Sequence, residues 1–264
     1  MTNAVGSSAP LVVITGASSG IGQALALHFA RAGWRLALLV RKENETKKWL
    51  DACKISCECY RIYVADVADT AATLAAGQAV LVQQGVPDVV IANAGISVGM
   101  DTADAADIDV MALTFATNNV GMAATFQPFV TPMVARGSGT LVGVASVAAI
   151  RGLPGHGAYC ASKAAVVSYL ESLRGELRAS GVKVVTLLPG YIDTPLTQRN
   201  RYPMPFLMQP QDFARQAAQA IEQQSSYAVI PWQMGVVAKL LRLLPNGLFD
   251  RIFAGRPRKH RQNE

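Results

Sequence analysis

Short runs of aliphatic residues alternate along the chain with longer stretches in which apolar residues recur every three or four positions. The short runs predict strands buried on both faces, and the longer stretches predict helices that cover them. The expected strands are 11–15, 35–40, 59–64, 88–92, 139–144, 182–188 and 227–230. The expected helices are 20–32, 43–53, 70–85, 104–135, 157–179 and 211–224, with a further amphipathic stretch at 234–253. This alternation predicts an α/β fold with a doubly wound parallel sheet of seven strands.

The pattern continues without an internal repeat, a low-complexity linker or a charge block before residue 256, so we expect residues 1–264 to form one domain. No uninterrupted apolar run reaches the ~18–20 residues that a membrane-spanning helix needs. The longest candidate, 234–249, is broken by Lys239, Arg242 and Pro245. The first ten residues lack the basic and apolar regions of a signal peptide, which favours a cytoplasmic location with reduced thiols.

Charge is distributed unevenly, and this argues against a nucleic-acid partner. The formal net charge is +6, but residues 239–264 alone carry seven Lys and Arg against two acidic residues. The rest of the chain is therefore nearly neutral, unlike the broad basic face of a nucleic-acid-binding domain. The basic C-terminus needs a separate explanation.

Three of the four cysteines, at positions 53, 57 and 59, stand close enough together to suggest a metal site. No second cysteine or histidine pair at ligand spacing completes a tetrahedral set, and the three histidines are scattered. We therefore expect no metal.

A glycine-rich loop, TGASSGIG at residues 15–22, joins the first expected strand to the first expected helix. Glycines allow a tight turn and a close approach of the backbone to a pyrophosphate, which then lies at the positive end of the helix. Such a loop alone is weak support for a nucleotide site, but its place between strand and helix strengthens it.

Together with this loop, four further motifs resemble the classical short-chain dehydrogenase/reductase family. The loop matches every fixed position of the family's TGxxxGIG motif, and Asn93-Ala94-Gly95 ends the fourth strand where the family carries NNAG, with Ala92 replacing the first Asn. The other matches are Asn118 with Gly121, Ser146 with Tyr159 and Lys163, and Pro189-Gly190 before Thr194. They follow the family's order over residues 11–195, and the resemblance implies a Rossmann-like fold and oxidoreductase activity.

The resemblance implies a catalytic set of Asn118, Ser146, Tyr159 and Lys163. Residues four apart on a helix share a face, so the Lys163 ammonium can lie near the Tyr159 phenol and favour its phenolate form. Tyr159 would be the general acid in ketone reduction and the base in alcohol oxidation. Lys163 would also hold the nicotinamide ribose, Ser146 would bind the substrate oxygen, and Asn118 would position a relay water.

The end of the second strand indicates which nicotinamide cofactor is used. Arg41-Lys42 stand where an NAD enzyme usually has an acidic residue, so Arg41, helped by Ser18, could bind the 2′-phosphate of NADP(H). The alternative is that Arg41 and Lys42 merely begin a solvated helix. The expected cofactor-binding residues are Gly16, Ser18, Ser19, Gly20, Ile21, Gly22, Arg41, Asp66, Asn93, Tyr159, Lys163, Pro189, Gly190 and Thr194.

The segment 196–210 is expected to be a lid over the substrate pocket. Its methionine, phenylalanine and leucine side chains could give it an adaptable apolar face, or could simply pack it onto the sheet. The favoured function is NADP(H)-dependent reduction of an apolar carbonyl substrate to its alcohol. The alternatives are an NADP(H)-binding regulatory protein with little turnover and a membrane-surface scaffold. The resemblance also implies a homodimer or homotetramer, formed through the helices at 104–135 and 157–179.

Residues 234–264 form an amphipathic, basic extension. An apolar stripe is expected on one helical face, followed by a second apolar set and then by the basic run 256–261. The stripe comprises Met234, Val237, Leu240, Leu241 and Leu244. Apolar residues next to cations are typical of peripheral membrane contact. Alternatively, the stripe packs on the domain or on a sister subunit, and the tail is solvated.

Overall fold

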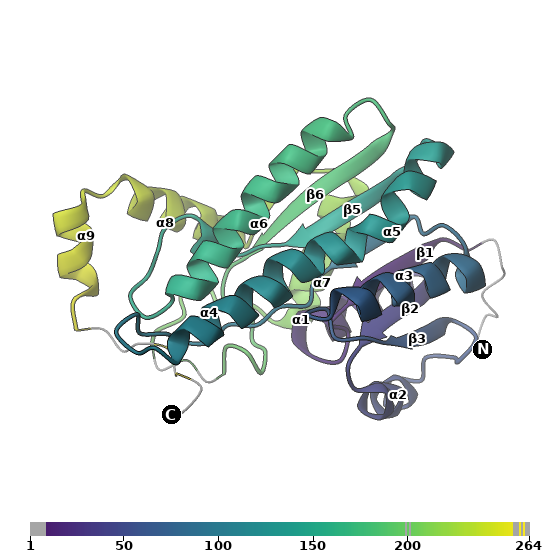
Figure 1. Cartoon of the computed structure of the whole chain (residues 1–264), viewed down its shortest axis with the longest axis horizontal. Coiled ribbons are helices and arrows are strands. Elements are labelled where there is room, and N and C mark those ends of the chain that lie inside the picture. Colours follow the sequence, from purple (N-terminus) through teal and green to yellow (C-terminus); the bar gives the residue numbers. More distant parts are fainter. Residues whose placement is uncertain (1–8, 199, 201, 256–258, 260, 262–264) are drawn as a thin grey trace.

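Seven parallel strands form one twisted sheet in the order β3-β2-β1-β4-β5-β6-β7 (Figure 1). The computed structural model describes residues 9–198, 200, 202–255, 259 and 261. The strands are β1 (Leu11–Thr15), β2 (Arg35–Val40), β3 (Tyr60–Val64), β4 (Val89–Ala92), β5 (Gly139–Val144), β6 (Val182–Pro189) and β7 (Tyr227–Ile230). Strand β1 pairs with β2 on one side and with β4 on the other. The strand order reverses there, which opens a crevice at the carboxyl ends of the strands.

Helices cover both faces of the sheet. They are α1 (Gly20–Arg31), α2 (Glu43–Ala52), α3 (Thr70–Gln84), α4 (Asp107–Phe115), α5 (Gly121–Arg136), α6 (Gly157–Glu176), α7 (Pro210–Glu222), α8 (Trp232–Leu243) and α9 (Asn246–Phe253). A π-helical turn, η1 (Ala116–Val120), joins α4 to α5, and a 3₁₀ turn, η2 (Val147–Ala149), precedes α6. Among the described residues, no helix is long and apolar enough to cross a membrane.

Two hydrophobic cores lie on opposite faces of the sheet because side chains alternate along each strand. Val12 and Ile14 of β1 join Phe29 of α1 and Phe213 of α7 in one core. Leu11 and Val13 belong to the other core, which contains side chains of α3, α5 and α6. Burial on both faces explains why the strands consist of continuous apolar runs.

The expected fold class is confirmed, with each strand boundary within one residue of its expected position. The single helix expected over 104–135 was wrong, because η1 separates α4 from α5. The stretch 234–253 is likewise two helices. Leu244 adopts an extended backbone and precedes Pro245, and a residue before proline disfavours the helical conformation.

The apolar stripe of α8 packs mostly on the domain, which is one of the alternatives left open by the sequence. Met234 is buried, and Val237, Leu241 and Leu244 are half-buried, so most of the stripe packs inward. Leu240 is the member of the stripe that is 60% exposed. The sequence periodicity identified one apolar face of α8, and this face packs against the body of the protein.

Candidate active site

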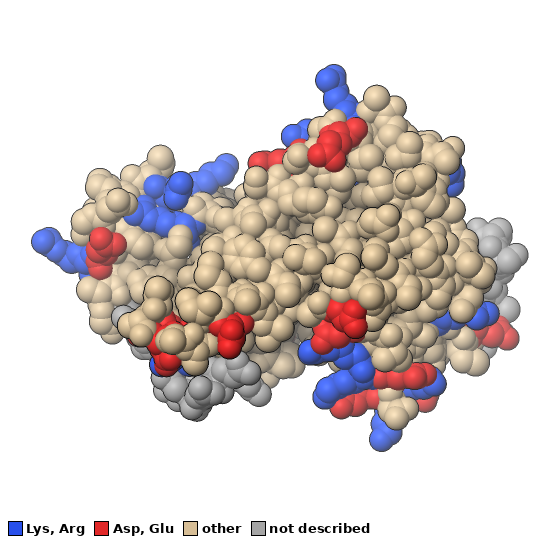
Figure 2. Space-filling model, viewed as in Figure 1, with Lys and Arg blue, Asp and Glu red and all other residues tan. Residues whose placement is uncertain are grey.

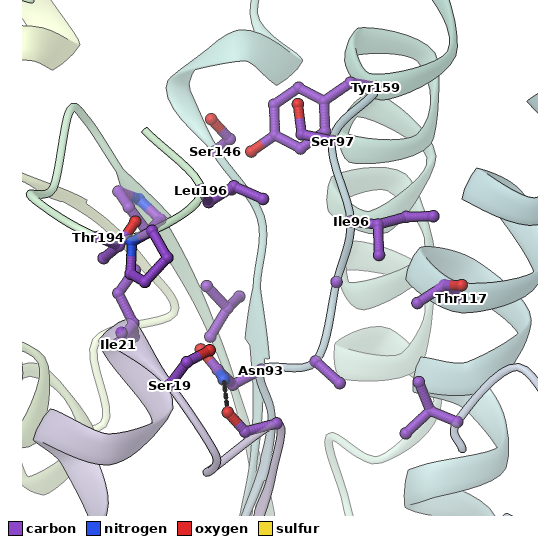
Figure 3. Close-up of a pocket in the computed structure, with 18 of the residues that line it drawn as sticks. Ser19, Ile21, Asn93, Ile96, Ser97, Thr117, Ser146, Tyr159, Thr194 and Leu196 are labelled. Atoms are coloured by element: carbon purple, nitrogen blue, oxygen red, sulfur yellow. Dashed lines mark hydrogen bonds between the residues drawn. The ribbon is translucent and has the colours of Figure 1, made fainter. Parts of the chain in front are cut away.

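A cavity of about 940 Å³ lies at the carboxyl ends of the strands, where parallel α/β sheets bind their ligands (Figure 3). Its walls come from the loops after β1, β2, β3, β4, β5 and β6. The expected site residues that line it are Gly16, Ser18, Ser19, Gly20, Ile21, Arg41, Asp66, Asn93, Ser146, Tyr159, Lys163, Pro189, Gly190 and Thr194. Gly22 and Asn118 lie behind the wall.

The glycine loop presents bare backbone to this cavity. Gly16 and Gly20 have φ values of +69° and +53°, which L side chains rarely adopt. A Cβ at Gly22 would lie 2.2 Å from the Gly16 carbonyl oxygen, so Gly22 allows the helix to begin against the turn. Ser19 caps α1 without a side-chain hydrogen bond, and the first turn contains no acidic residue. The first backbone N–H groups of α1 therefore remain suited to an anion.

Thr15 and Asn93 hold the glycine loop against β4. The Thr15 hydroxyl accepts hydrogen bonds from the backbone N–H groups of Asn93 and Ala94, both at 3.0 Å. The Asn93 amide donates to the Thr15 carbonyl, also at 3.0 Å. Asn93 thus positions the loop as well as lining the cavity. Thr15 was not singled out from the sequence, although a polar residue at the end of an otherwise aliphatic strand was a signal.

Ser146 and Tyr159 face each other at the inner end of the cavity (Figure 3). Ser146 ends the loop after β5, and Tyr159 lies in the first turn of α6. Burial raises the pKa of Tyr159 to about 12, and a hydrogen bond with Ser146 opposes this rise because it favours the phenolate. The Tyr159 phenol therefore carries its proton at neutral pH.

Lys163 lies one helical turn after Tyr159 and is 4% exposed. Its Nζ donates a hydrogen bond to the Val144 carbonyl at 2.8 Å and lies 5.9 Å from the centroid of the Tyr159 ring. Burial lowers the pKa of Lys163 to about 8. Burial has the largest effect on the pKa of Tyr159, and the contact that opposes it is the hydrogen bond with Ser146. The sequence-based expectation that the Lys163 ammonium favours the phenolate stays a prediction.

Asn118 is fully buried in the π-helical turn and connects three elements. Its Oδ1 accepts from the Ile96 N–H at 2.8 Å, while its Nδ2 donates to the Ile96 carbonyl at 3.0 Å and to Ser162 Oγ at 2.9 Å. Ser162 in turn donates to the Tyr159 carbonyl at 2.8 Å. Asn118 therefore fastens the loop after β4 to the helix that carries Tyr159. Ser162 was missed because a serine inside a helix carries no distinctive sequence signal.

Arg41 and Asp66 lie at the outer end of the cavity, after β2 and β3. The Arg41 guanidinium is 3.5 Å from the Asp66 carboxylate, and both side chains are largely exposed. The Asp66 Oδ1 also accepts the N–H of Ala68 at 3.0 Å, which fixes its orientation. An exposed pair at this distance contributes little to stability, so Arg41 can turn toward a ligand.

The segment 196–210, expected as a lid, contributes Leu196 and Thr197 to the cavity wall. Met208 pairs with Ile192 in an isolated bridge and packs against the core, whereas Phe206 and Leu207 are exposed. The Tyr202 hydroxyl is 3.2 Å from a ring nitrogen of His156, just before α6. The segment thus borders the cavity at its start and is attached to the body farther along.

Two residues of the C-terminal tail, Lys259 and Arg261, line the same cavity. Arg261 forms ion pairs with Asp107, at 2.8 Å, and with Asp104, and these pairs hold the pKa of both carboxyl groups below their usual range. Burial lowers the pKa of Lys259 to about 8. No sequence pattern predicted that Lys259 and Arg261 would line the cavity. The neighbouring Arg256, Arg258 and His260 lie outside the described residues.

The residues present suit a bound nicotinamide dinucleotide. The first turn of α1 and the close-packed glycines would receive the pyrophosphate, and Arg41 and Asp66 flank the adenosine end. At the other end, a Cβ on Gly95 would lie 3.0 Å from Asn118 Oδ1 and 3.4 Å from Lys163 Nζ, so the glycine leaves the space beside both groups open. Such an extended cleft can hold a dinucleotide with its reactive ring beside Tyr159.

Comparisons with known proteins agree with this arrangement. A family model described as "short chain dehydrogenase" matches residues 10–204. An uncharacterized oxidoreductase of Myxococcus xanthus is 38% identical over 238 residues, covering 90% of this chain and 94% of the relative. Human short-chain dehydrogenase/reductase 3 is 30% identical, covering 91% and 81%. A crystal structure of a short-chain dehydrogenase/reductase from Burkholderia phymatum with NAD superposes with a TM-score of 0.79 at 26% identity, covering 88% and 92%.

Proposed function

Since the chain belongs to the short-chain dehydrogenase/reductase family of nicotinamide-dependent oxidoreductases, we propose that it uses NADP(H) to reduce an apolar ketone or aldehyde. The observation that carries this proposal is the geometry of the inner end of the cavity, where the Tyr159 phenol faces Ser146 and Lys163 follows one helical turn later. A carbonyl oxygen placed between the phenol and the Ser146 hydroxyl would meet both groups. The Lys163 ammonium lies farther back, 5.9 Å from the centroid of the phenol ring.

The chain's own residues handle the proton and orient the substrate. Ser146 donates a hydrogen bond to the carbonyl oxygen, and Tyr159 transfers its phenolic proton to that oxygen as the alcohol forms. The Lys163 ammonium and the Ser146 hydroxyl then stabilise the phenolate until it is reprotonated. When bound, the nicotinamide supplies the hydride in reduction and accepts it in oxidation.

The reductive direction is favoured by the pKa of Tyr159. A group with a pKa of about 12 is almost entirely protonated at neutral pH and can act as an acid without prior ionisation. Oxidation of an alcohol would instead require the phenolate as a base, and burial makes that form costly. We therefore expect faster turnover of carbonyl substrates than of the matching alcohols near neutral pH.

The NADP(H) preference rests on Arg41. Its guanidinium is 66% exposed at the outer end of the cavity, held only by a long contact with Asp66. Lys42 forms an ion pair with Glu45 at 2.8 Å. Of the two cations at this turn, Arg41 is therefore the one better placed to bind a phosphate. A planar guanidinium suits a phosphate because it can donate two parallel hydrogen bonds.

Substitution of Arg41 tests the cofactor preference. The Arg41→Asp variant should lose NADPH affinity and gain relative NADH affinity, because attraction to the 2′-phosphate becomes repulsion. We expect the ratio of kcat/KM values, NADPH over NADH, to fall at least about tenfold. Arg61→Asp, at an exposed arginine of β3 outside the cavity, is the matched control. Equal kcat/KM values for both cofactors in the wild type would refute the preference.

An apolar substrate is supported by the inner walls of the cavity. Ile96, Val98, Leu113, Ile192 and Leu196 contribute aliphatic side chains to it. Purified protein should be assayed with NADPH and a series of ketones of increasing apolar size, following oxidation of NADPH. We expect kcat/KM to rise with apolar size. Tight NADPH binding without turnover of any ketone would instead favour the regulatory, cofactor-binding alternative.

A further inference from the structure

Helix α8 is apolar on two opposite sides. Its inner side belongs to the body of the protein, where Met234 lies against Gly190 of the cavity wall and Ala238 is buried. Its outer side carries four large apolar residues, each of them exposed. They are Trp232, Val236, Leu240 and Leu243, with exposed fractions of 69%, 47%, 60% and 79%.

The spacing of these four residues places them on one face. They are separated by four, four and three positions, the intervals at which helical side chains line up. An apolar side chain stabilises a protein most when it is removed from water, so two apolar sides favour a position between two apolar environments. The sheet and the cavity wall provide one of them for α8, and the outer face lacks a partner among the described residues.

Arg151 fastens the turn between α8 and α9. Its guanidinium donates hydrogen bonds to the carbonyls of Leu241 and Leu244 and, at 3.1 Å, to Asn246 Oδ1. It also lies 3.8 Å from the centroid of the Phe249 ring, which is buried below it. Helix α9 is thereby held with Leu248 and Ile252, four positions apart, exposed at 47% and 38%.

Cations accompany this apolar surface. Lys239, Arg242 and Arg251 are exposed on the two helices, against the single acidic residue Asp250. Figure 2 shows basic side chains gathered over this end of the molecule, with uncharged surface between them. Lys239 lies three positions after Val236 and four before Leu243, at the edge of the apolar face. Its aliphatic stem can lie along this face while its ammonium reaches outward.

We propose that the exposed faces of α8 and α9 dock on an anionic lipid bilayer. The aliphatic and indole side chains would enter the interface between headgroups and acyl chains, and the cations would meet lipid phosphates. A second copy of the chain fits this face less well. A two-fold contact there would gather Lys239, Arg242 and Arg251 of both copies around an apolar interface, with Asp250 as the acidic residue of these helices in each copy.

Docking of α8 and α9 on a bilayer would give an apolar substrate a short path into the cavity. This purpose rests on the proposed function. Helix α8 packs against η2, which follows Ser146 directly, and against Gly190 in the cavity wall. The docking surface therefore lies beside the substrate end of the cavity, and Figure 1 shows α8 and α9 together at one end of the molecule. A carbonyl compound dissolved in the bilayer would be concentrated next to Ser146 and Tyr159.

The test is sedimentation of the full-length protein with vesicles of phosphatidylcholine and phosphatidylglycerol at low salt. We expect the wild type to pellet with these vesicles and to remain in the supernatant with phosphatidylcholine alone. The Leu240→Glu/Leu243→Glu variant should bind at least about tenfold more weakly for each leucine replaced. Lys239→Gln/Arg242→Gln should bind about fivefold more weakly per charge, the equivalent of about 1 kcal/mol each. Val82→Glu, at an exposed valine of α3, is the matched control and should bind like the wild type.

A second measurement depends on Trp232 alone. Bilayers containing brominated lipid should quench part of the tryptophan fluorescence of the wild type and leave that of Trp232→Phe unchanged.

Failure of the wild type to pellet with anionic vesicles, or undiminished binding of the Leu240→Glu/Leu243→Glu variant, would overturn the proposal. A smaller assembly for that variant in light scattering, without vesicle binding by the wild type, would assign the face to a second copy. Ketone turnover measured in parallel keeps this outcome separate from failure of the proposed function.

Discussion

At the scale of single residues, burial controls the two titrating groups of the site. It raises the pKa of Tyr159 to about 12 and lowers that of Lys163 to about 8. Both shifts have the same cause, since a buried site disfavours whichever form of a group is charged. The phenol is therefore kept as an acid, whereas the ammonium is only modestly stable as a cation.

Removal of the Tyr159 hydroxyl tests its role as the acid. Tyr159→Phe should lower kcat for ketone reduction at least about a hundredfold, because the proton donor is lost while the ring and its packing remain. NADPH affinity, measured by fluorescence titration, should stay close to that of the wild type. Tyr169→Phe, on the same helix α6, is the control and should keep normal turnover. Wild-type activity in Tyr159→Phe would reject the mechanism.

The pH dependence of reduction should report on Lys163. Below a pKa of about 8 the ammonium is charged, and above it the charge is lost, whereas the Tyr159 phenol stays protonated up to pH about 12. We expect kcat/KM to decline as the pH rises through about 8. Lys163→Arg keeps its charge throughout this range, so whatever activity it retains should lack the decline. An unchanged alkaline limb in this variant would assign the limb to another group.

At the scale of elements, the π-helical turn between α4 and α5 connects the site to the fold. Its wider turn contains Asn118, which spans from the loop after β4 to Ser162 on α6. Single π-helical turns of this kind are frequent at functional sites. Here the turn ties one wall of the cavity to the helix that carries both Tyr159 and Lys163.

Loss of this connection should affect stability and turnover together. Asn118→Ala leaves the Ile96 N–H and carbonyl without their partner, which should lower the free energy of unfolding by about 1–3 kcal/mol, and should also lower kcat. Ser162→Ala keeps both bonds to Ile96 and should be the milder variant in both respects. Denaturant titration and steady-state kinetics provide the two measurements. A stable Asn118→Ala variant with low kcat would instead favour a direct role in proton relay.

At the scale of the whole molecule, exposed apolar side chains on α4, η1 and α5 support the expected self-association. Ile108, Met111, Val120 and Val134 are 54%, 37%, 51% and 40% exposed. We expect light scattering to give the mass of a homodimer or homotetramer, and Met111→Asp to shift it toward the monomer because the charge would be desolvated. Val82→Asp, on α3, is the control. A monomeric wild type at micromolar concentration would contradict this expectation.

Much of the fold and of the candidate site followed from local sequence patterns. Continuous aliphatic runs predicted the buried strands, and the glycine loop, Ser146 and the Tyr159–Lys163 spacing predicted where the cavity residues would meet. These features depend on near neighbours along the chain, because helical spacing and strand alternation act over a few residues.

Only the tertiary structure decided the features that depend on distant contacts. Arg261 reaches Asp107 across 154 residues of sequence, and no local pattern encodes such a pairing. The position of the sheet decided which face of α8 is buried in the core, because both faces are apolar. The protonated state of Tyr159 likewise depended on burial, since the sequence shows that a lysine is near but does not show how much water is excluded.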